Sequence, residues 1–249
     1  MSYISFQPKD YFNTLLYTDN GANRTLTGVG FQPDWVWIKT RNHTNSHNLF
    51  DAVRGANKVI RSNQNYAEAT TTDTLTAFTS DGFSLGVDAS GYGVNYDNKN
   101  EVAWNWKANG AGSANTDGNI TSTVSTNTTA GFSIVKYTGD GTTGQTVGHG
   151  LGSVPKLIIN KQLTSQNWFV YHHSIGNTKV LKLNTTDAET TSSGWNNTTP
   201  TSSVFTIGTS SSTNVSGVDF INYCFAEKKG FSKFGSYTGN GEASDNAFI

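Results

Sequence analysis

Alternation of apolar and polar residues runs through this chain. In residues 101–107 the alternation puts Val102, Trp104 and Trp106 on one face and polar or small residues on the other. That pattern predicts an antiparallel strand with one buried face. Residues 34–39 are aromatic and β-branched, lie between a proline and a polar loop, and predict a second strand.

Further short strands follow, separated by glycine-rich turns. Residues 132–137 carry apolar side chains in both registers, so we expect both faces of that strand to be covered. Residues 48–60 come nearest to a helical period, and we expect a loop or a short helix there. Short strands with turn signals every 8–12 residues predict an all-β protein of the β-sandwich or jelly-roll type.

The same order of landmarks occurs twice, at an offset of about 120 residues, which is too long for a solenoid repeat. Matched landmarks are Phe12 and Phe132, Tyr17 and Tyr137, Pro33 and Pro155, Lys39 and Lys161, Phe50 and Phe169, Lys58 and Lys179, Glu68 and Glu189, and Trp104 and Tyr223. We therefore expect an internal duplication that gives two tandem jelly-roll or lectin-like β-sandwiches.

This repeat divides the chain into four parts. Residues 1–108 form the first predicted β-sandwich and residues 131–235 the second. Residues 109–130 between them are rich in Gly, Asn, Ser and Thr, which predicts a polar, weakly ordered linker. The pattern starts again near residue 230, so residues 236–249 are predicted to begin a truncated third repeat or to form a C-terminal tail.

Composition narrows the class of protein. Charged residues make up 14% of the chain and the net charge is −1. The basic stripe expected for binding nucleic acid or anionic membranes is therefore missing from the sequence. No apolar run approaches the roughly 18 residues of a membrane span, and the N-terminus does not resemble a signal peptide. A surface rich in hydroxyl and amide groups favours an extracellular or virion protein made in the host cytoplasm.

Several motifs resemble one family. Residues 31–39 (FQPDWVWIK), 49–56 (LFDAVRGA) and 102–107 (VAWNWK) are similar to tandem domains in tail-fibre and other virion proteins of phages, many of them marine. Residues 147–152 and 223–233 resemble the next domain of the same proteins. The resemblance implies a lectin-like jelly-roll fold, a place in the virion, contacts with other virion proteins and a homotrimer.

Catalytic and metal-binding constellations do not emerge from the sequence. A single cysteine, Cys224, excludes a disulfide framework and a cysteine-based zinc site. His43 and His47 lie in a turn-rich segment, and the adjacent His172 and His173 would face opposite ways on a strand. The pair of carboxylates that a glycosidase needs is not recognisable. We expect no enzymatic activity, no metal and no cofactor.

Sugar binding is the remaining candidate chemistry, because aromatic rings stack on sugar rings while amides bind the hydroxyl groups. Trp195 and Asn196 lie in one polar loop, and Tyr92 and Tyr96 in another. These loops differ between the two copies, and such loops on a rigid scaffold often bind ligands. A host polysaccharide would be the ligand. The alternative is that these rings fix their own loops.

Two charged pairs recur in a chain with few charges. Lys58 and Glu68 have the same spacing as Lys179 and Glu189. We expect each pair to meet across neighbouring segments, partly buried, as a contact that fixes the fold.

These observations favour a non-enzymatic structural protein of a phage virion, namely a tail-fibre or adhesin module that presents loops to the host surface. One alternative is a capsid decoration or head-fibre protein without receptor binding. Another is a spike enzyme that degrades glycans. The sequence does not separate the adhesin from the decoration protein.

Overall fold

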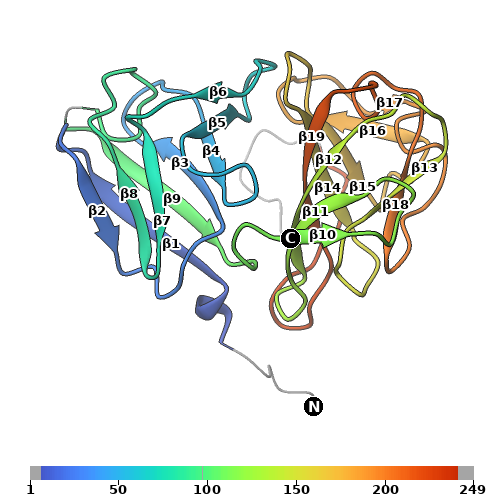
Figure 1. Ribbon diagram of the computed structural model, residues 1–249, viewed down its shortest axis with the longest axis horizontal. Coiled ribbons are helices and arrows are strands. Elements are labelled where there is room, and N and C mark those ends of the chain that lie inside the picture. Colours follow the sequence, from blue (N-terminus) through green and yellow to red (C-terminus); the bar gives the residue numbers. More distant parts are fainter. Residues whose placement is uncertain (1–6, 97, 241–249) are drawn as a thin grey trace.

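The computed structural model describes residues 7–96 and 98–240, and within them the fold is all-β. Figure 1 shows two lobes side by side, the first built from β1 to β9 and the second from β10 to β19. The helix that precedes them, η1 (Pro8–Asp10), is a single 3₁₀ turn. Among the described residues no helix is long and apolar enough to cross a membrane.

The first lobe contains two antiparallel sheets. Its main sheet has the strand order β1-β9-β3-β4-β5-β6, and its small sheet has the order β2-β8-β7. The strands are β1 (Phe12–Thr18), β2 (Arg24–Thr27), β3 (Trp35–Thr40), β4 (Asn48–Asp51), β5 (Lys58–Arg61), β6 (Ala69–Thr70), β7 (Leu75–Thr79), β8 (Gly82–Leu85) and β9 (Asn100–Trp106). The segment 48–60, expected to be a loop or a short helix, is the β4–β5 hairpin.

The second lobe also pairs a large and a small sheet. Its main sheet has the order β10-β11-β12-β19-β14-β15-β16-β17, and β13 pairs with β18. The strands are β10 (Ser113–Asn115), β11 (Ser122–Asn127), β12 (Phe132–Thr138), β13 (Gln145–Gly148), β14 (Leu157–Gln162), β15 (Phe169–His172), β16 (Lys179–Lys182), β17 (Thr190–Thr191), β18 (Val204–Ile207) and β19 (Asp219–Phe225).

The two main sheets share a strand order. The run β12-β19-β14-β15-β16-β17 corresponds to β1-β9-β3-β4-β5-β6, and β13-β18 corresponds to β2-β8. The register agrees as well, because Trp104 lies opposite Trp37 and Tyr223 lies opposite Ile159. The order of landmarks in the sequence therefore matches an order of strands in space.

One landmark match is wrong by two residues. Val36 pairs with Phe50, and the corresponding Ile158 pairs with Tyr171. Phe50 therefore corresponds to Tyr171 and not to Phe169. A shift of two residues keeps a side chain on the same face of the sheet. The match of one phenylalanine with another therefore concealed the error.

Central strands of both main sheets are buried on both faces. In β3, Val36 joins the core between the two sheets of the first lobe, whereas Trp35 packs in a cluster shared with the second lobe. In β12, Phe132 joins the shared cluster and Val135 joins the core of the second lobe. The two-sided burial expected for residues 132–137 is confirmed.

The prediction that 101–107 buries one face only is wrong. Trp106 packs against the shared cluster, but Glu101, Ala103 and Asn105 on the other face are also buried, inside the first lobe. Alternation of apolar and polar residues usually indicates a face in water. Here the polar-looking face points into the interior of the first lobe, and Trp106 on the other face packs against the cluster shared with the second lobe.

The stretch 109–130 is not a weakly ordered linker. It contributes β10 and β11, and β11 pairs with β12. Val124 lies in the core of the second lobe, and the buried Ser122 donates its hydroxyl to the carbonyl of Gly148 at 3.0 Å. Serine and threonine hydroxyls satisfy neighbouring backbone groups, so a polar run forms strands at a sheet edge. Of the predicted third repeat at 236–249, residues 241–249 lie outside the described residues.

Candidate functional site

The two lobes meet in a seam of aromatic and aliphatic side chains between their main sheets. Its buried members are Trp35, Leu49, Ile60, Ala108, Phe132, Ile134, Ile159, Trp168, Val170, Ile221 and Tyr223. Trp35 stacks on Tyr223 with ring centroids 4.2 Å apart and an angle of 17° between the rings. Large aromatic rings bury more apolar area than any other side chains, so this seam holds the lobes together as one body.

A buried charge network lies beside Tyr223 in the seam. Arg54 Nε donates to Asp51 Oδ2 at 2.5 Å, and Arg54 Nη1 donates to Glu68 Oε2 at 3.1 Å. Tyr223 of the second lobe donates its hydroxyl to the same Asp51 oxygen at 2.8 Å. The side chains of Asp51 and Arg54 are 0% and 1% exposed. Removing one member of such a network leaves an unpaired charge in the interior.

The network shifts the pKa of its member Arg54 and the pKa of the nearby Lys161. Burial lowers the pKa of Arg54, but the charge of Asp51 and the neighbouring Tyr223 and Glu68 outweigh burial and raise that pKa. Lys161, buried in the second lobe, has its pKa lowered to about 8, first by burial and then by the charge of Arg54. Its ammonium donates to the carbonyls of Gln162 and of Thr164 in its own loop.

Hydrogen bonds to backbone carbonyls also cross the seam. Trp168 Nε1 donates to the carbonyl of Arg61 at 2.9 Å. The amide of Glu68 donates to the carbonyl of Leu163 at 2.9 Å, and the amide of Gln166 to that of Asn65 at 2.8 Å. Since these bonds have fixed geometry, they set the orientation of the lobes as well as their contact.

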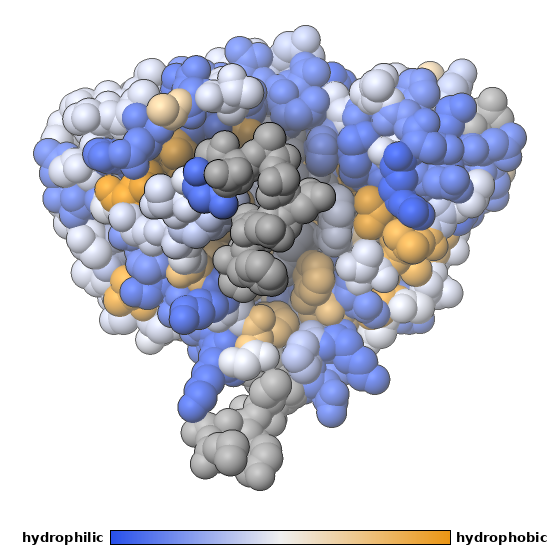
Figure 2. Space-filling view, turned by 180° about the vertical axis from the view of Figure 1, so that it is seen from behind, coloured by the Kyte–Doolittle hydropathy of each residue, from blue (hydrophilic) through white to orange (hydrophobic). Residues whose placement is uncertain are grey.

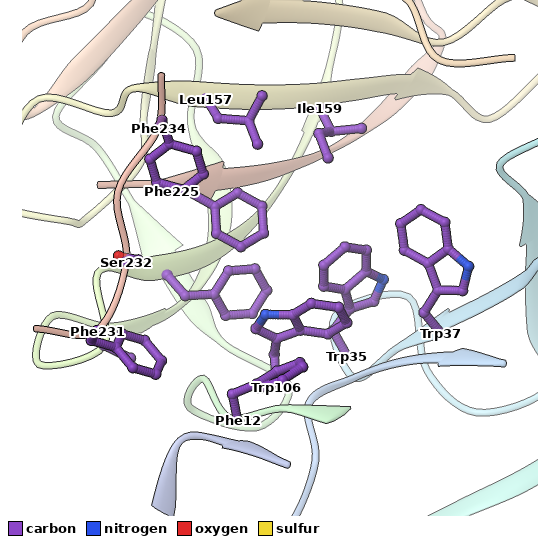
Figure 3. Close-up of a pocket in the computed structure, with 12 residues that line it drawn as sticks. Phe12, Trp35, Trp37, Trp106, Leu157, Ile159, Phe225, Phe231, Ser232 and Phe234 are labelled. Atoms are coloured by element: carbon purple, nitrogen blue, oxygen red, sulfur yellow. The ribbon is translucent and has the colours of Figure 1, made fainter. Parts of the chain in front are cut away.

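An aromatic groove of about 380 Å³ opens along the seam. Its lining residues are Phe12, Trp35, Trp37, Trp106, Ala130, Phe132, Leu157, Ile159, Phe225, Phe231, Ser232 and Phe234. In Figure 3 the three tryptophans of the first lobe form one wall, and Leu157, Ile159 and Phe225 of the second lobe face them. On the face of the molecule drawn in Figure 2 the surface is mostly hydrophilic, with hydrophobic residues in a few patches.

Corresponding positions of the two lobes line this groove together. The pairs are Phe12 and Phe132, Trp35 and Leu157, Trp37 and Ile159, and Trp106 and Phe225. The segment after β19 adds a further wall with Phe231 and Phe234. Glu227 accepts a hydrogen bond from the Phe234 amide at 3.0 Å, and His173 Nε2 lies 3.0 Å from the Phe234 carbonyl oxygen.

Chemically, the groove suits an apolar ligand. Ser232 is the one lining residue with a hydroxyl, and no carboxylate, imidazole or thiol belongs to the described lining. A sugar or an extended peptide needs several hydrogen-bonding partners, because a polar group buried without a partner costs about 1–3 kcal/mol. An apolar chain or ring carries no such cost.

Comparison with known proteins assigns this two-lobed chain to a family. Residues 7–249 match the family described as Domain of unknown function (DUF7483). The chain belongs to this family. The match spans both lobes and the groove, and the description names no activity. No curated protein and no solved structure matches the chain.

Trp195 of this DUF7483 chain does not face a ligand. It is 1% exposed and packs in the core of the second lobe, with its ring centroid 5.9 Å from Tyr171 and 6.3 Å from Phe205. The small sheet here lacks a counterpart of β7, and Trp195 fills the core next to β18. Stacking of Trp195 on a sugar is therefore excluded in this conformation, and the ring fixes its own loop.

The other predicted sugar-binding residues are scattered. Asn196 is half-buried at a positive φ of 48° beside Trp195, in a tight turn. Tyr92 packs against the first-lobe core, with the Arg61 guanidinium 4.5 Å from its ring centroid. Tyr96 is 53% exposed and is the one ring of the predicted set that faces solvent. None of these four residues lines the aromatic groove.

Both predicted charged pairs form, in different surroundings. Lys58 Nζ lies 3.6 Å from Glu68 Oε1, and Glu68 is 17% exposed. Lys179 contacts Glu189, but these side chains are 42% and 38% exposed. The first pair is partly buried as expected, and its buried partner is Arg54, which the sequence comparison missed. The second is a surface pair.

Two buried carboxyls, Asp19 and Glu101, lie near the end of β9 that is opposite to Trp106. They are 2% and 0% exposed, and none of their carboxyl oxygens has a hydrogen-bond partner in the described part of the chain. Burial, with Asp88 nearby, raises the pKa of Asp19 to about 6. Burial, reinforced by the charge of Asp19, raises the pKa of Glu101 to about 8.

A buried tyrosine hydrogen bond also occurs in both lobes and was not expected from the sequence. Tyr17 donates its hydroxyl to the carbonyl of Val94, and Tyr137 donates to that of Thr213. The residue after each of these carbonyls is an asparagine. Asn95 accepts a hydrogen bond from the Asn20 amide, and Asn214 accepts from the amides of Asp140 and Gly141. The spacing of the partners is nearly the same in both lobes, 77 and 76 residues, but Val94 and Thr213 take part only through their backbone carbonyls, which leave no signal in the sequence.

Metal binding has no support among the described residues. No group of three or more His, Cys, Asp or Glu side chains is placed there to hold a metal ion. His47 accepts a hydrogen bond from Trp37 Nε1 at 2.9 Å, and His43 bonds Asn45. The rings of His172 and His173 lie 5.1 Å apart, so they do not point opposite ways; β15 ends at His172, and strand alternation no longer applies.

Proposed function

We propose that this chain is a non-enzymatic structural component of a phage virion, a tail-fibre or adhesin module. The observation that carries the proposal is the seam: two sandwiches locked face to face by stacked rings, a buried ion network and backbone bonds. A rigid double module suits a load-bearing fibre. The resemblance of residues 31–39 and 102–107 to phage virion proteins supports the same role.

Within this proposal the chain is a tandem duplication of a lectin-like jelly roll. The shared strand order of the main sheets and the shared register at Trp104 and Tyr223 support it. We place the first domain at 1–108. We start the second near residue 109, because β10 and β11 extend its main sheet.

Host attachment would use loops at the surface, and Tyr96 is the exposed ring that fits such a role. A host polysaccharide would be the ligand, and other virion proteins and two further copies of the chain the partners. A capsid decoration protein is the alternative, in which the same rigid module ornaments the head without binding a receptor.

Antibody labelling of intact virions tests this proposal. Gold particles on the tail tip, together with inhibition of phage adsorption by the purified chain, are expected for the adhesin. Labelling of the head without inhibition would assign the decoration role. Absence of the chain from purified virions would refute both. Release of reducing sugars from host polysaccharide by the purified chain would refute the non-enzymatic assignment.

A further inference from the structure

The aromatic groove is bordered by a cationic rim. A shallow depression next to it is lined by Glu227, Lys228, Lys229, Gly230 and Lys233, and Phe231 and Ser232 line both. The rim thus has three ammonium groups and one carboxylate, in a chain whose net charge is −1. Glu227 already accepts the Phe234 amide. None of the three lysines forms an ion pair within the described residues.

Groove and rim together have the polarity of an amphiphile. An apolar groove open to solvent costs hydration free energy unless something covers it, and ligand pockets typically enclose about 300–1,000 Å³. The lining offers one hydroxyl, which disfavours a saccharide or an extended peptide, since both need many hydrogen-bonding partners. The lysine rim favours a negative charge at one end of the ligand.

We propose that the groove binds a single-chain anionic amphiphile of the fatty-acid type, with its apolar chain between the tryptophan wall and Leu157, Ile159 and Phe225. Its carboxylate lies at Lys228, Lys229 and Lys233. This inference does not depend on a virion location, because it rests only on the groove and its rim.

Titration with dodecanoate, below its critical micelle concentration, tests the proposal. Trp35, Trp37 and Trp106 line the groove, so their fluorescence reports occupancy. We expect a saturable change with dodecanoate. Dodecyltrimethylammonium, with the same chain and the opposite charge, is expected to bind about tenfold or more weakly. Butanoate, with the same charge and a short chain, is expected not to bind.

Two variants separate the contribution of the ligand's hydrocarbon chain to binding from the contribution of its charge. Replacing Lys228, Lys229 and Lys233 by Gln should weaken dodecanoate binding about tenfold or more and leave dodecyltrimethylammonium binding unchanged or stronger. The matched control replaces Lys99, Lys179 and Lys182, which line neither depression, and should bind as the unaltered chain does. Phe234→Ala should weaken every ligand with a long chain, with circular dichroism as the check on folding.

Several outcomes would overturn the proposal. Equal binding of both headgroups, or no effect of the rim substitutions, would show that the lysines do not select an anionic headgroup. Capture of phosphatidylglycerol vesicles without binding of monomeric dodecanoate would assign the surface to membranes. Dimerisation that dodecanoate does not disrupt would assign the groove to a second copy. Binding by a chain shortened to Asn240, but not by the full chain, would show that the groove is not available to a ligand.

Discussion

The two lobes share a strand order and place their charges differently. The first lobe has Asp51 and Arg54 at the end of β4 and the turn after it, and the second has His172 and Ile175 at the corresponding places. Asp51 and Arg54 are buried because the second lobe covers them and Tyr223 bonds to Asp51. The repeated pair Lys179–Glu189, without such a cover, stays in water. One framework thus supports a buried network or a surface pair, according to what packs on it.

The largest effect is expected from Arg54→Ala. Loss of the Arg54 guanidinium leaves Asp51 charged and without an ion-pair partner in the seam, which lowers the free energy of unfolding by about 3–5 kcal/mol. Denaturant titration measures this. Ile175→Ala, at the corresponding place in the second lobe, is the control and is expected to cost less. Equal losses would show that the buried network has no special role.

Truncation of either large buried tryptophan should cost about 3–5 kcal/mol as well. Trp35→Ala removes the ring that stacks on Tyr223 in the seam, and Trp195→Ala removes a ring from the second-lobe core. Thermal unfolding of each variant is the measurement. A Trp195→Ala variant of unchanged stability that fails to bind host glycans would restore the sugar-binding hypothesis for that loop.

The carboxyl pair belongs to the first lobe only, because Phe220 occupies the second-lobe position of Glu101, and it makes the stability of the chain depend on pH. In the folded chain the pKa of Glu101 is about 8, above the ordinary value of 4.5 for this side chain. Its contribution is therefore complete below about pH 4.5, is lost as the pH rises towards 8, and is constant above that. The total is on the order of 1–4 kcal/mol. Glu101→Gln should flatten the profile between pH 5 and 8, and an unchanged slope would contradict the raised pKa of Glu101.

The smallest effect is expected at Lys179 and Glu189. Both are more than a third exposed, so solvent screens the pair and its coupling should be about 0–1 kcal/mol. A double-mutant cycle followed by thermal unfolding measures that coupling. A coupling above about 2 kcal/mol would mean that something covers this surface in solution.

Much of the fold is predictable from sequence, and the seam is not. Alternation and turn signals predicted the all-β class, and the landmark order matched the strand order. The two-sided pattern of 132–137 indicated a covered second face without saying what covers it. Trp35 and Val36 alternate between two cores, and only the packing of the lobes reveals that both faces are interior.

The candidate site was missed for a related physical reason. Phe12, Leu157 and Phe234 are distant in sequence and meet only when the two sheets face each other. Polar loops such as 193–197 suggested ligand binding, yet Trp195 packs inward because its sheet lacks a strand. A loop that differs between copies reports a difference in packing as readily as a difference in ligand.

The central claim, that the seam makes one folding unit of the two lobes, is tested most directly by differential scanning calorimetry of the full chain. The account predicts one transition whose calorimetric enthalpy equals its van't Hoff enthalpy. It also predicts that Arg54→Ala lowers that transition as a whole. Two resolved transitions, with only one of them shifted by Arg54→Ala, would show that the lobes unfold independently and would contradict the claim.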